Sequence, residues 1–288
     1  MSNEFIRYEK EPPLARIVLD QPRKRNPLSN ALRDELEDAL RDADEDKAIR
    51  VVIIKGAGPA FSAGYDLTPK PVPDFGSADG NLHEQLYDLK RSGQRWLRAI
   101  WDFRKPVIAQ VHGFCMAGAN DLAGVCDLTV AADDTIFSVN ESRVLGTNHL
   151  LGLWPLLIGM KKAKELFFTG GYVTGAEAAE LGMINRAVPY DRLEEETEAL
   201  AHRVAMAPAE LLHSIKQGIN RWYEIMGLDT MVRSTGEWDG LGSQNPKIAE
   251  WARIVESQGV RAALDWRDGP YGDRPFPYEP KGPEDDEG

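Results

Sequence analysis

The sequence predicts an α/β protein built on parallel strands, and two observations carry this prediction. Short segments rich in β-branched residues recur along the chain, and stretches with helical periodicity separate them. Such alternation is typical of parallel strands joined by helical crossovers. A chain of 288 residues with 42% hydrophobic residues can also bury a sizeable core. The predicted strands are residues 16–19, 51–55, 107–111, 128–132 and 184–188.

A helix is predicted between the first two strands. Ser29 can cap its N-terminus, and the leucines that follow at intervals of four then share one face, while acidic and basic residues face water. Further on, residues 68–82 contain three prolines and two glycines, which predicts a mobile surface loop beside a pocket. Helical periodicity then resumes up to Trp101. The leucines of the first helix are Leu32, Leu36 and Leu40.

The chain becomes mainly helical after the last predicted strand. Periodicity dominates residues 193–226, and Pro208 is placed for the first turn of a second helix. We therefore divide the chain into a core of residues 1–195 and a helical module of residues 196–279. Residues 280–288 combine proline, glycine and acidic side chains, a composition that predicts a disordered tail.

The composition excludes several classes of partner. Lys and Arg total 34 against 46 Asp and Glu, and this net charge of -12 disfavours binding to nucleic acid or to an anionic membrane. The first residues lack the apolar region of a signal peptide, and no apolar run reaches the length of a membrane span. Cys115 and Cys126 lie in apolar surroundings without metal-ligand spacing, which is typical of buried thiols in a reducing compartment. We expect a cytoplasmic protein without a bound metal.

Two loops of small residues each follow a predicted strand. Residues 61–67 follow the strand of residues 51–55, and residues 113–122 follow that of residues 107–111. Small residues let the backbone approach a ligand closely, and amides at a helix start point towards negative charge. Two such loops can place two N–H donors around one oxygen, as acyl chemistry requires.

Four stretches of the sequence, in order and in spacing, are similar to those of one family. The chain resembles the crotonase family, also called the enoyl-CoA hydratase/isomerase family, from about Phe5 to Tyr271. The resemblance implies a crotonase-like spiral of ββα units, followed by a helical C-terminal module that assembles homotrimers or homohexamers. The four matching stretches are residues 21–28, 61–67, 113–127 and 168–182.

The resemblance also implies which residues bind the substrate. The oxyanion hole falls on the backbone N–H groups of Tyr65 and Gly118, so the backbone position of Tyr65 matters more than its side chain. Coenzyme A belongs to the acyl-CoA substrate, and no separate cofactor is implied. The residues implied to bind coenzyme A are Arg23, Lys24, Arg25, Ala63 and Asp66.

Two acids are the candidate catalytic groups. Asp121 follows Gly118 by three residues, where hydratases of the family carry a glutamate that is one methylene longer. Glu141 matches the second glutamate when counted from Phe137, but the register slips by one when counted back from Gly146. A carboxyl group in apolar surroundings can move a proton near an enolisable thioester. Without the flanking motifs, a helix cap and an exposed loop acid would explain these two residues.

The favoured activity is the addition of water to a trans-2-enoyl-CoA. Isomerisation of an enoyl- or dienoyl-CoA and hydrolysis of a thioester or a carbon–carbon bond are alternatives on the same enolate platform. The family's dienoyl-CoA isomerases use a further aspartate downstream, where residues 146–150 here offer only His149 as a titratable group. A non-catalytic RNA-binding homologue is a fourth alternative, disfavoured by the negative charge.

Overall fold

The strands form two sheets. The computed structural model describes residues 3–67, 96–146, 153–242 and 244–272. The larger sheet has the order β1-β2-β3-β4-β6-β9, and the smaller one has the order β5-β7-β8. The larger sheet comprises β1 (Ile6–Glu11), β2 (Leu14–Leu19), β3 (Val51–Gly56), β4 (Val107–Val111), β6 (Leu128–Ala132) and β9 (Arg186–Val188). The smaller sheet comprises β5 (Phe114–Met116), β7 (Ile136–Ser138) and β8 (Tyr172–Thr174).

All five predicted strands are present, and they lie parallel in the larger sheet. The successive pairs from β2 to β9 are parallel, and only β1 pairs antiparallel, with β2. The prediction missed β1 because it is an edge strand whose side chains mostly face water, so it lacks a β-branched run. It also missed β5, β7 and β8, which have three residues each, too few for a period to show.

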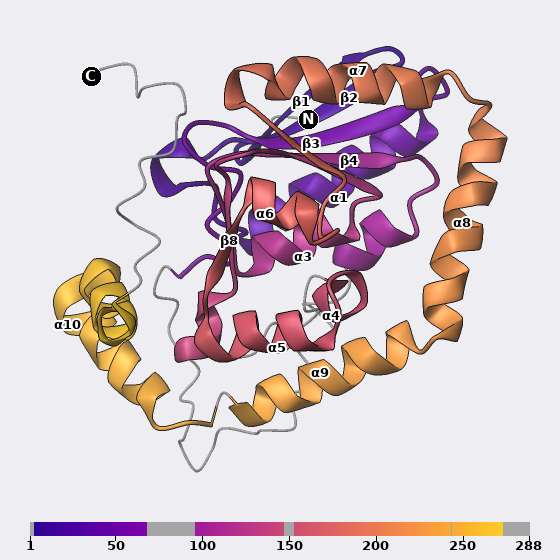
Figure 1. Cartoon of the computed structure of the whole chain (residues 1–288). Helices are drawn as coiled ribbons and strands as arrows, with labels where there is room; N and C mark the ends of the chain where they lie inside the picture. The colour runs from indigo at the N-terminus through magenta and orange to yellow at the C-terminus, as the bar shows by residue number, and fades with distance from the viewer. Residues whose placement is uncertain (1–2, 68–95, 147–152, 243, 273–288) are drawn as a thin grey trace.

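Helices cover both faces of the larger sheet. Helix α1 (Asn30–Glu45) begins as predicted, since the Ser29 side chain accepts a hydrogen bond from Leu32 N at 3.2 Å. Its three predicted leucines are buried in the main core. Helix α7 (Leu193–Ala205) covers the opposite face, where it packs on β2, β3, β4 and β6. Figure 1 shows α7 on one side of the sheet, and α1 and α3 (Gly118–Val125) on the other.

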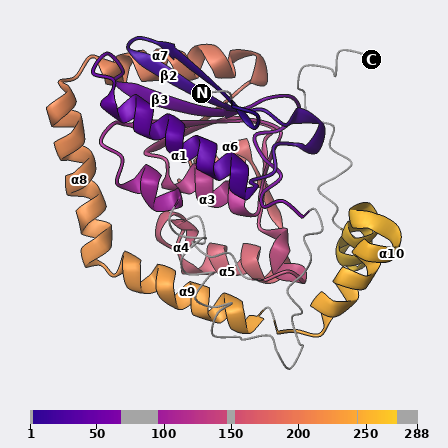
Figure 2. The same ribbon diagram turned by 180° about the vertical axis from the view of Figure 1, so that it is seen from behind.

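Three long helices form the last part of the described chain and curve around the core. Figures 1 and 2 show α8 running down one side, α9 passing beneath α4 (Trp154–Leu157) and α5 (Met160–Thr169), and α10 standing at the opposite side. Pro208 is the N-cap of α8, one position before the first turn in which the sequence analysis placed it. The three helices are α8 (Ala209–Ile225), α9 (Leu228–Gly242) and α10 (Lys247–Asp268).

Some predictions concern residues whose structure is not described. The proline-rich loop of residues 68–82, His149 and the tail of residues 280–288 lie outside the described ranges. The boundary at residue 195 falls within α7 and stays a prediction. Among the described residues, none of the helices is long and apolar enough to cross a bilayer.

Candidate active site

Three loops that follow neighbouring parallel strands meet at one edge of the larger sheet. Because β2, β3 and β4 are adjacent and parallel, the loops after them leave at their shared carboxyl edge, where α/β proteins bind ligands. The loop after β3 runs alongside β5. Ser62 N donates to Phe114 O at 3.1 Å, and Met116 N donates to Ser62 O at 3.1 Å. The two small-residue loops predicted from the sequence are therefore hydrogen-bonded neighbours.

Gly64 brings one loop against the amide of the other. A Cβ atom added to Gly64 would lie 2.6 Å from Met116 O and 3.3 Å from Gly118 N, and the φ of +86° also favours glycine. Gly118 is the first residue of α3, where amide groups lack partners within the helix. Within the described residues, no acceptor binds the Gly118 N–H. The two amides predicted for the oxyanion hole, those of Tyr65 and Gly118, thus come from touching loops.

The Tyr65 side chain also belongs to the site. A Cβ atom added to Gly118 would lie 2.5 Å from Cε2 and 2.7 Å from Cζ of Tyr65, so the ring covers this glycine. Burial raises the pKa of the Tyr65 hydroxyl well above its usual value, and the charge of Asp121 raises it further. The charge of Arg33 opposes this shift, whereas Glu141 and Asp239 raise the pKa. Tyr65 therefore adds a neutral hydroxyl group beside three acids, beyond the backbone position that the sequence indicated.

The two predicted acids reach the site from different elements. Asp121 lies in the first turn of α3 and is fully buried, where the helix N-terminus favours a negative charge. Glu141 lies in the short 3₁₀ helix Asn140–Arg143, and its Oε2 is buried without a hydrogen-bond partner among the described residues. Burial raises the pKa of Glu141 to about 7, although Arg267 opposes this shift. The charges of both acids raise the pKa of the Tyr65 hydroxyl, so both carboxyl groups lie close enough to interact with it.

Helix α9 supplies a third acid, Asp239, that the sequence analysis missed. Its side chain is 7% exposed. A Cβ atom added to Gly146 would lie 2.7 Å from Asp239 Oδ1, and Gly146 N donates to Glu141 O at 3.2 Å. The negative charge of Asp239 also raises the pKa of Glu141. No local signal in the sequence indicated it, because Asp239 lies about one hundred residues after Glu141 in the chain.

Helix α10 fixes the segment that carries Glu141. Arg143 Nη1 lies 3.3 Å from Asp268 Oδ1, with both side chains at most 2% exposed. Asp268 also pairs with Arg267 at 2.8 Å, and the Arg143 guanidinium lies 4.1 Å from the centre of the Tyr271 ring. Removing one member of such a buried ion pair is costly because it leaves a charge without compensation. The end of α10 therefore fixes the position of the short 3₁₀ helix that carries Glu141.

The predicted coenzyme A loop is joined to the oxyanion loop. Ala63 N donates to Arg25 O at 2.8 Å, and Ala63 and the three basic residues of the loop are exposed. Asn26, which the sequence analysis did not single out, is fully buried and donates from Nδ2 to Ala57 O and Ala60 O at 2.8 Å. Asp66 lies partly buried beside Tyr65. The loops are therefore held in one unit, with the basic residues Arg23, Lys24 and Arg25 on its surface.

His112 and the two cysteines have contacts that are typical of structural residues. His112 Nε2 lies 2.7 Å from Gly58 O and is thus a hydrogen-bonding residue at the end of β4. Cys115 and Cys126 are buried free thiols, as predicted. In the described ranges, His, Cys, Asp and Glu form no group of three that could hold a metal ion.

A comparison with protein families decides the family. The model for enoyl-CoA hydratase/isomerase matches residues 9–235. The chain belongs to this family. Its fold is the crotonase fold, since the crystal structure of an enoyl-CoA hydratase from Mycobacterium smegmatis superposes with a TM-score of 0.87 at 29% identity, covering 94% of this chain and 96% of that one. An enoyl-CoA hydratase/isomerase from Xanthobacter autotrophicus Py2 gives a TM-score of 0.85 at 32% identity, covering 93% and 99%.

Curated relatives within the enoyl-CoA hydratase/isomerase family differ in their named reactions. EchA13 of Mycobacterium tuberculosis, which carries the name of an enoyl-CoA hydratase, is 35% identical over 256 residues, 80% of this chain and 77% of the relative. A hydroxycinnamoyl-CoA hydratase-lyase of Pseudomonas fluorescens is 29% identical over 223 residues, 76% of this chain and 79% of the relative. Asp239 and α10 lie beyond the residues that the family model matches.

Proposed function

We propose that this protein adds water across the double bond of a trans-2-enoyl-CoA thioester. The observation that carries the proposal is the meeting of two backbone amides, at Tyr65 and Gly118, with two acids, Asp121 and Glu141. Two N–H donors can stabilise the oxygen of a thioester enolate, and acids beside it can move protons at carbon. The family membership and the named activities of the relatives support the same reaction.

In the proposed mechanism, the amides hold the thioester oxygen while Asp121 and Glu141 hold a water molecule. The water oxygen bonds to C3 and one carboxyl group takes its proton, while the electrons of the double bond move towards the thioester and form the enolate. The second proton transfer, from a carboxyl group to C2, restores the thioester carbonyl. A pKa of about 7 suits Glu141 to both giving and taking a proton near neutral pH.

The nucleotide half of the substrate is proposed to lie along the joined loops. The exposed cations of Arg23, Lys24 and Arg25 can meet the phosphates, and the loop around Ala63 and Asp66 can meet the adenosine. Coenzyme A enters with the substrate, so the reaction needs no separate cofactor. Binding energy from this remote half can be used to position the acyl group.

Isomerisation is a second candidate, and Asp239 favours it. Moving a double bond requires taking a proton from one carbon and giving a proton to another, and a third acid near Glu141 and Tyr65 widens the set of carbons within reach. Asp121 is also shorter than the glutamate of the hydratases by one bond of about 1.5 Å, which disfavours a water held between two acids.

We further propose that the protein assembles as a homotrimer or homohexamer in the cytoplasm. Helix α8 supports the assembly because apolar side chains at helical spacing lie exposed along it, and monomeric proteins rarely expose such a stripe. The two buried thiols support a reducing compartment. The exposed side chains are Leu211, Ile215, Ile219, Trp222 and Ile225, each about half or more exposed.

Turnover of a substrate panel in deuterated water tests the proposal. A hydratase should add water to enoyl-CoA thioesters, and Asp121→Asn and Glu141→Gln should each lower the rate at least a hundredfold without loss of folding. An isomerase should instead take up deuterium at carbon without net addition of water. Wild-type activity in both variants on every substrate turned over would rule out the acid–base roles.

A further inference from the structure

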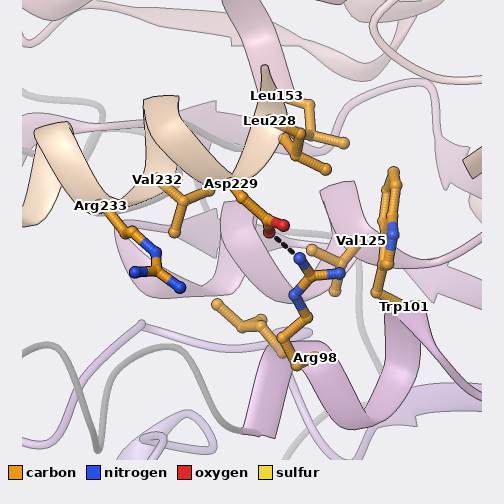
Figure 3. Close-up of a pocket in the computed structure, with 9 residues that line it drawn as sticks. Arg98, Trp101, Val125, Leu153, Leu228, Asp229, Val232 and Arg233 are labelled. Atoms are coloured by element: carbon orange, nitrogen blue, oxygen red, sulfur yellow. Dashed lines mark hydrogen bonds and ion pairs between the residues drawn. The ribbon is translucent and has the colours of Figure 1, made fainter. Parts of the chain in front are cut away.

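A cavity lies between the core and helix α9. It has a volume of about 280 Å³ and is lined mainly by apolar side chains, including Trp101, Val125, Leu228 and Val232. Two guanidinium groups, those of Arg98 and Arg233, complete its wall (Figure 3). None of these residues was a sequence-predicted site residue.

Two helices relate this cavity to the catalytic centre. On α3, Val125 lies seven residues beyond Gly118 and four beyond Asp121, so the three share one face. On α9, Val232 lies seven residues before Asp239, again on one face. Seven residues span about 10 Å of helix. Gly118 on α3 and Asp239 on α9 therefore each lie one seven-residue step from a residue that lines the cavity.

The two guanidinium groups at the cavity differ in their contacts. Arg98 forms ion pairs with Asp229, with Glu224 at 3.2 Å and with Asp102 at 3.5 Å. Figure 3 shows the Arg98–Asp229 pair bridging the cavity wall, with Arg233 extending from α9 beside Val232. Within the described part of the chain, Arg233 takes part in no hydrogen bond or ion pair. Arg98 is thus neutralised, whereas the charge of Arg233 is available to a ligand.

We propose that this cavity receives the far end of the acyl group and that Arg233 binds a carboxylate there, which makes the preferred substrate an acyl-CoA with a second, terminal carboxyl group. The proposal rests on the proposed function, because it takes the thioester to lie at Gly118. An extended chain advances about 1.2 Å per bond, so 10 Å corresponds to about eight bonds. The preferred acyl group is therefore of medium length.

Charge and polarity support a carboxylate over a methyl end. An arginine forms strong, two-pronged hydrogen bonds with a carboxylate, and Arg233 is exposed at the cavity wall, where a ligand can reach it. Asp229 is paired with Arg98, so it repels such a ligand less than a free carboxylate would. A neutral acyl end would use the apolar wall alone and leave the Arg233 charge unused.

Binding of saturated ligands tests the inference without requiring turnover. Decanoyl-CoA and the coenzyme A monothioester of decanedioic acid have the same length and differ only at the far end. Calorimetry on the wild type should show at least tenfold tighter binding of the carboxylate ligand. Arg233→Met should abolish this preference and leave decanoyl-CoA binding unchanged, and Arg233→Lys should retain part of it. Arg253→Met, on the exposed side of α10, is the matched control and should behave as the wild type.

Turnover then separates the two proposals. The corresponding trans-2-enoyl-CoA pair should show the same preference in kcat/KM. Equal binding of the two saturated ligands by the wild type, or an Arg233→Met variant that keeps the preference, would overturn the carboxylate site even if short enoyl-CoA substrates are hydrated. A preserved carboxylate preference without hydration of any enoyl-CoA would instead refute the proposed function alone.

Discussion

Replacing Glu141 by glutamine should reveal its raised pKa as a pH-dependent change in stability. Burial raises this pKa from 4.5 to about 7, so the folded state holds the proton more tightly than the unfolded state. Wild-type stability attributable to this proton is fully present below about pH 4.5 and is lost as the pH rises through 7. Glutamine does not titrate in this pH range, so the stability of the variant should not fall between pH 5 and pH 8 for this reason.

The size of the effect follows from the two pKa values. A change from 4.5 to about 7 corresponds to about 3 kcal/mol at full titration, of which about 2 kcal/mol falls between pH 5 and pH 8. Urea unfolding at both pH values, at one fixed protein concentration, should therefore show Glu141→Gln gaining about 2 kcal/mol relative to the wild type at the higher pH.

A matched variant separates this effect from a general change in charge. Glu256→Gln removes one exposed negative charge from α10, and its stability should run parallel to that of the wild type across the same pH range. A difference between Glu141→Gln and the wild type that is equal at pH 5 and pH 8 would show that Glu141 titrates near its ordinary value. The proposed exchange of protons at neutral pH would then lose its basis.

Three further outcomes are expected. Gly118→Ala should lower turnover about a hundredfold, because the added Cβ would lie 2.5 Å from the Tyr65 ring. Adding Tyr65→Ala should restore part of the rate. An unchanged rate in the single variant would show that Gly118 is not part of the oxyanion hole. Asp239→Asn should lower the pKa of Glu141 and move the alkaline limb of the pH–activity profile to lower pH, whereas a profile shifted upwards or not at all would contradict the contact. Trp222→Glu should convert the assembly to monomers, as measured by light scattering. The fold of the monomer should change little, because the Trp222 side chain is 72% exposed in a single chain. An unaltered molecular mass would show that the subunit interface lies elsewhere.

Local sequence patterns were enough to predict the parallel sheet and the two small-residue loops. Each depends on residues that lie close together in the chain: the β-branched runs, the cap at Ser29 and the glycines at Gly64 and Gly118. Local patterns of this kind specify backbone conformation, and parallel pairing then brings the loops to one edge. The sequence also indicated Asp121 and Glu141 as candidates, although counting left the register of Glu141 open.

Packing between distant elements determines which other side chains share the site with these acids. Asp239 is more than one hundred residues from Asp121 in the chain, and it reaches Glu141 because α8 and α9 curve around the core. The Tyr65 ring covers Gly118, and Arg233 faces the cavity, for the same reason: each contact joins elements that no local periodicity relates. A helical pattern fixes which residues share a face, but packing between distant elements fixes what that face meets.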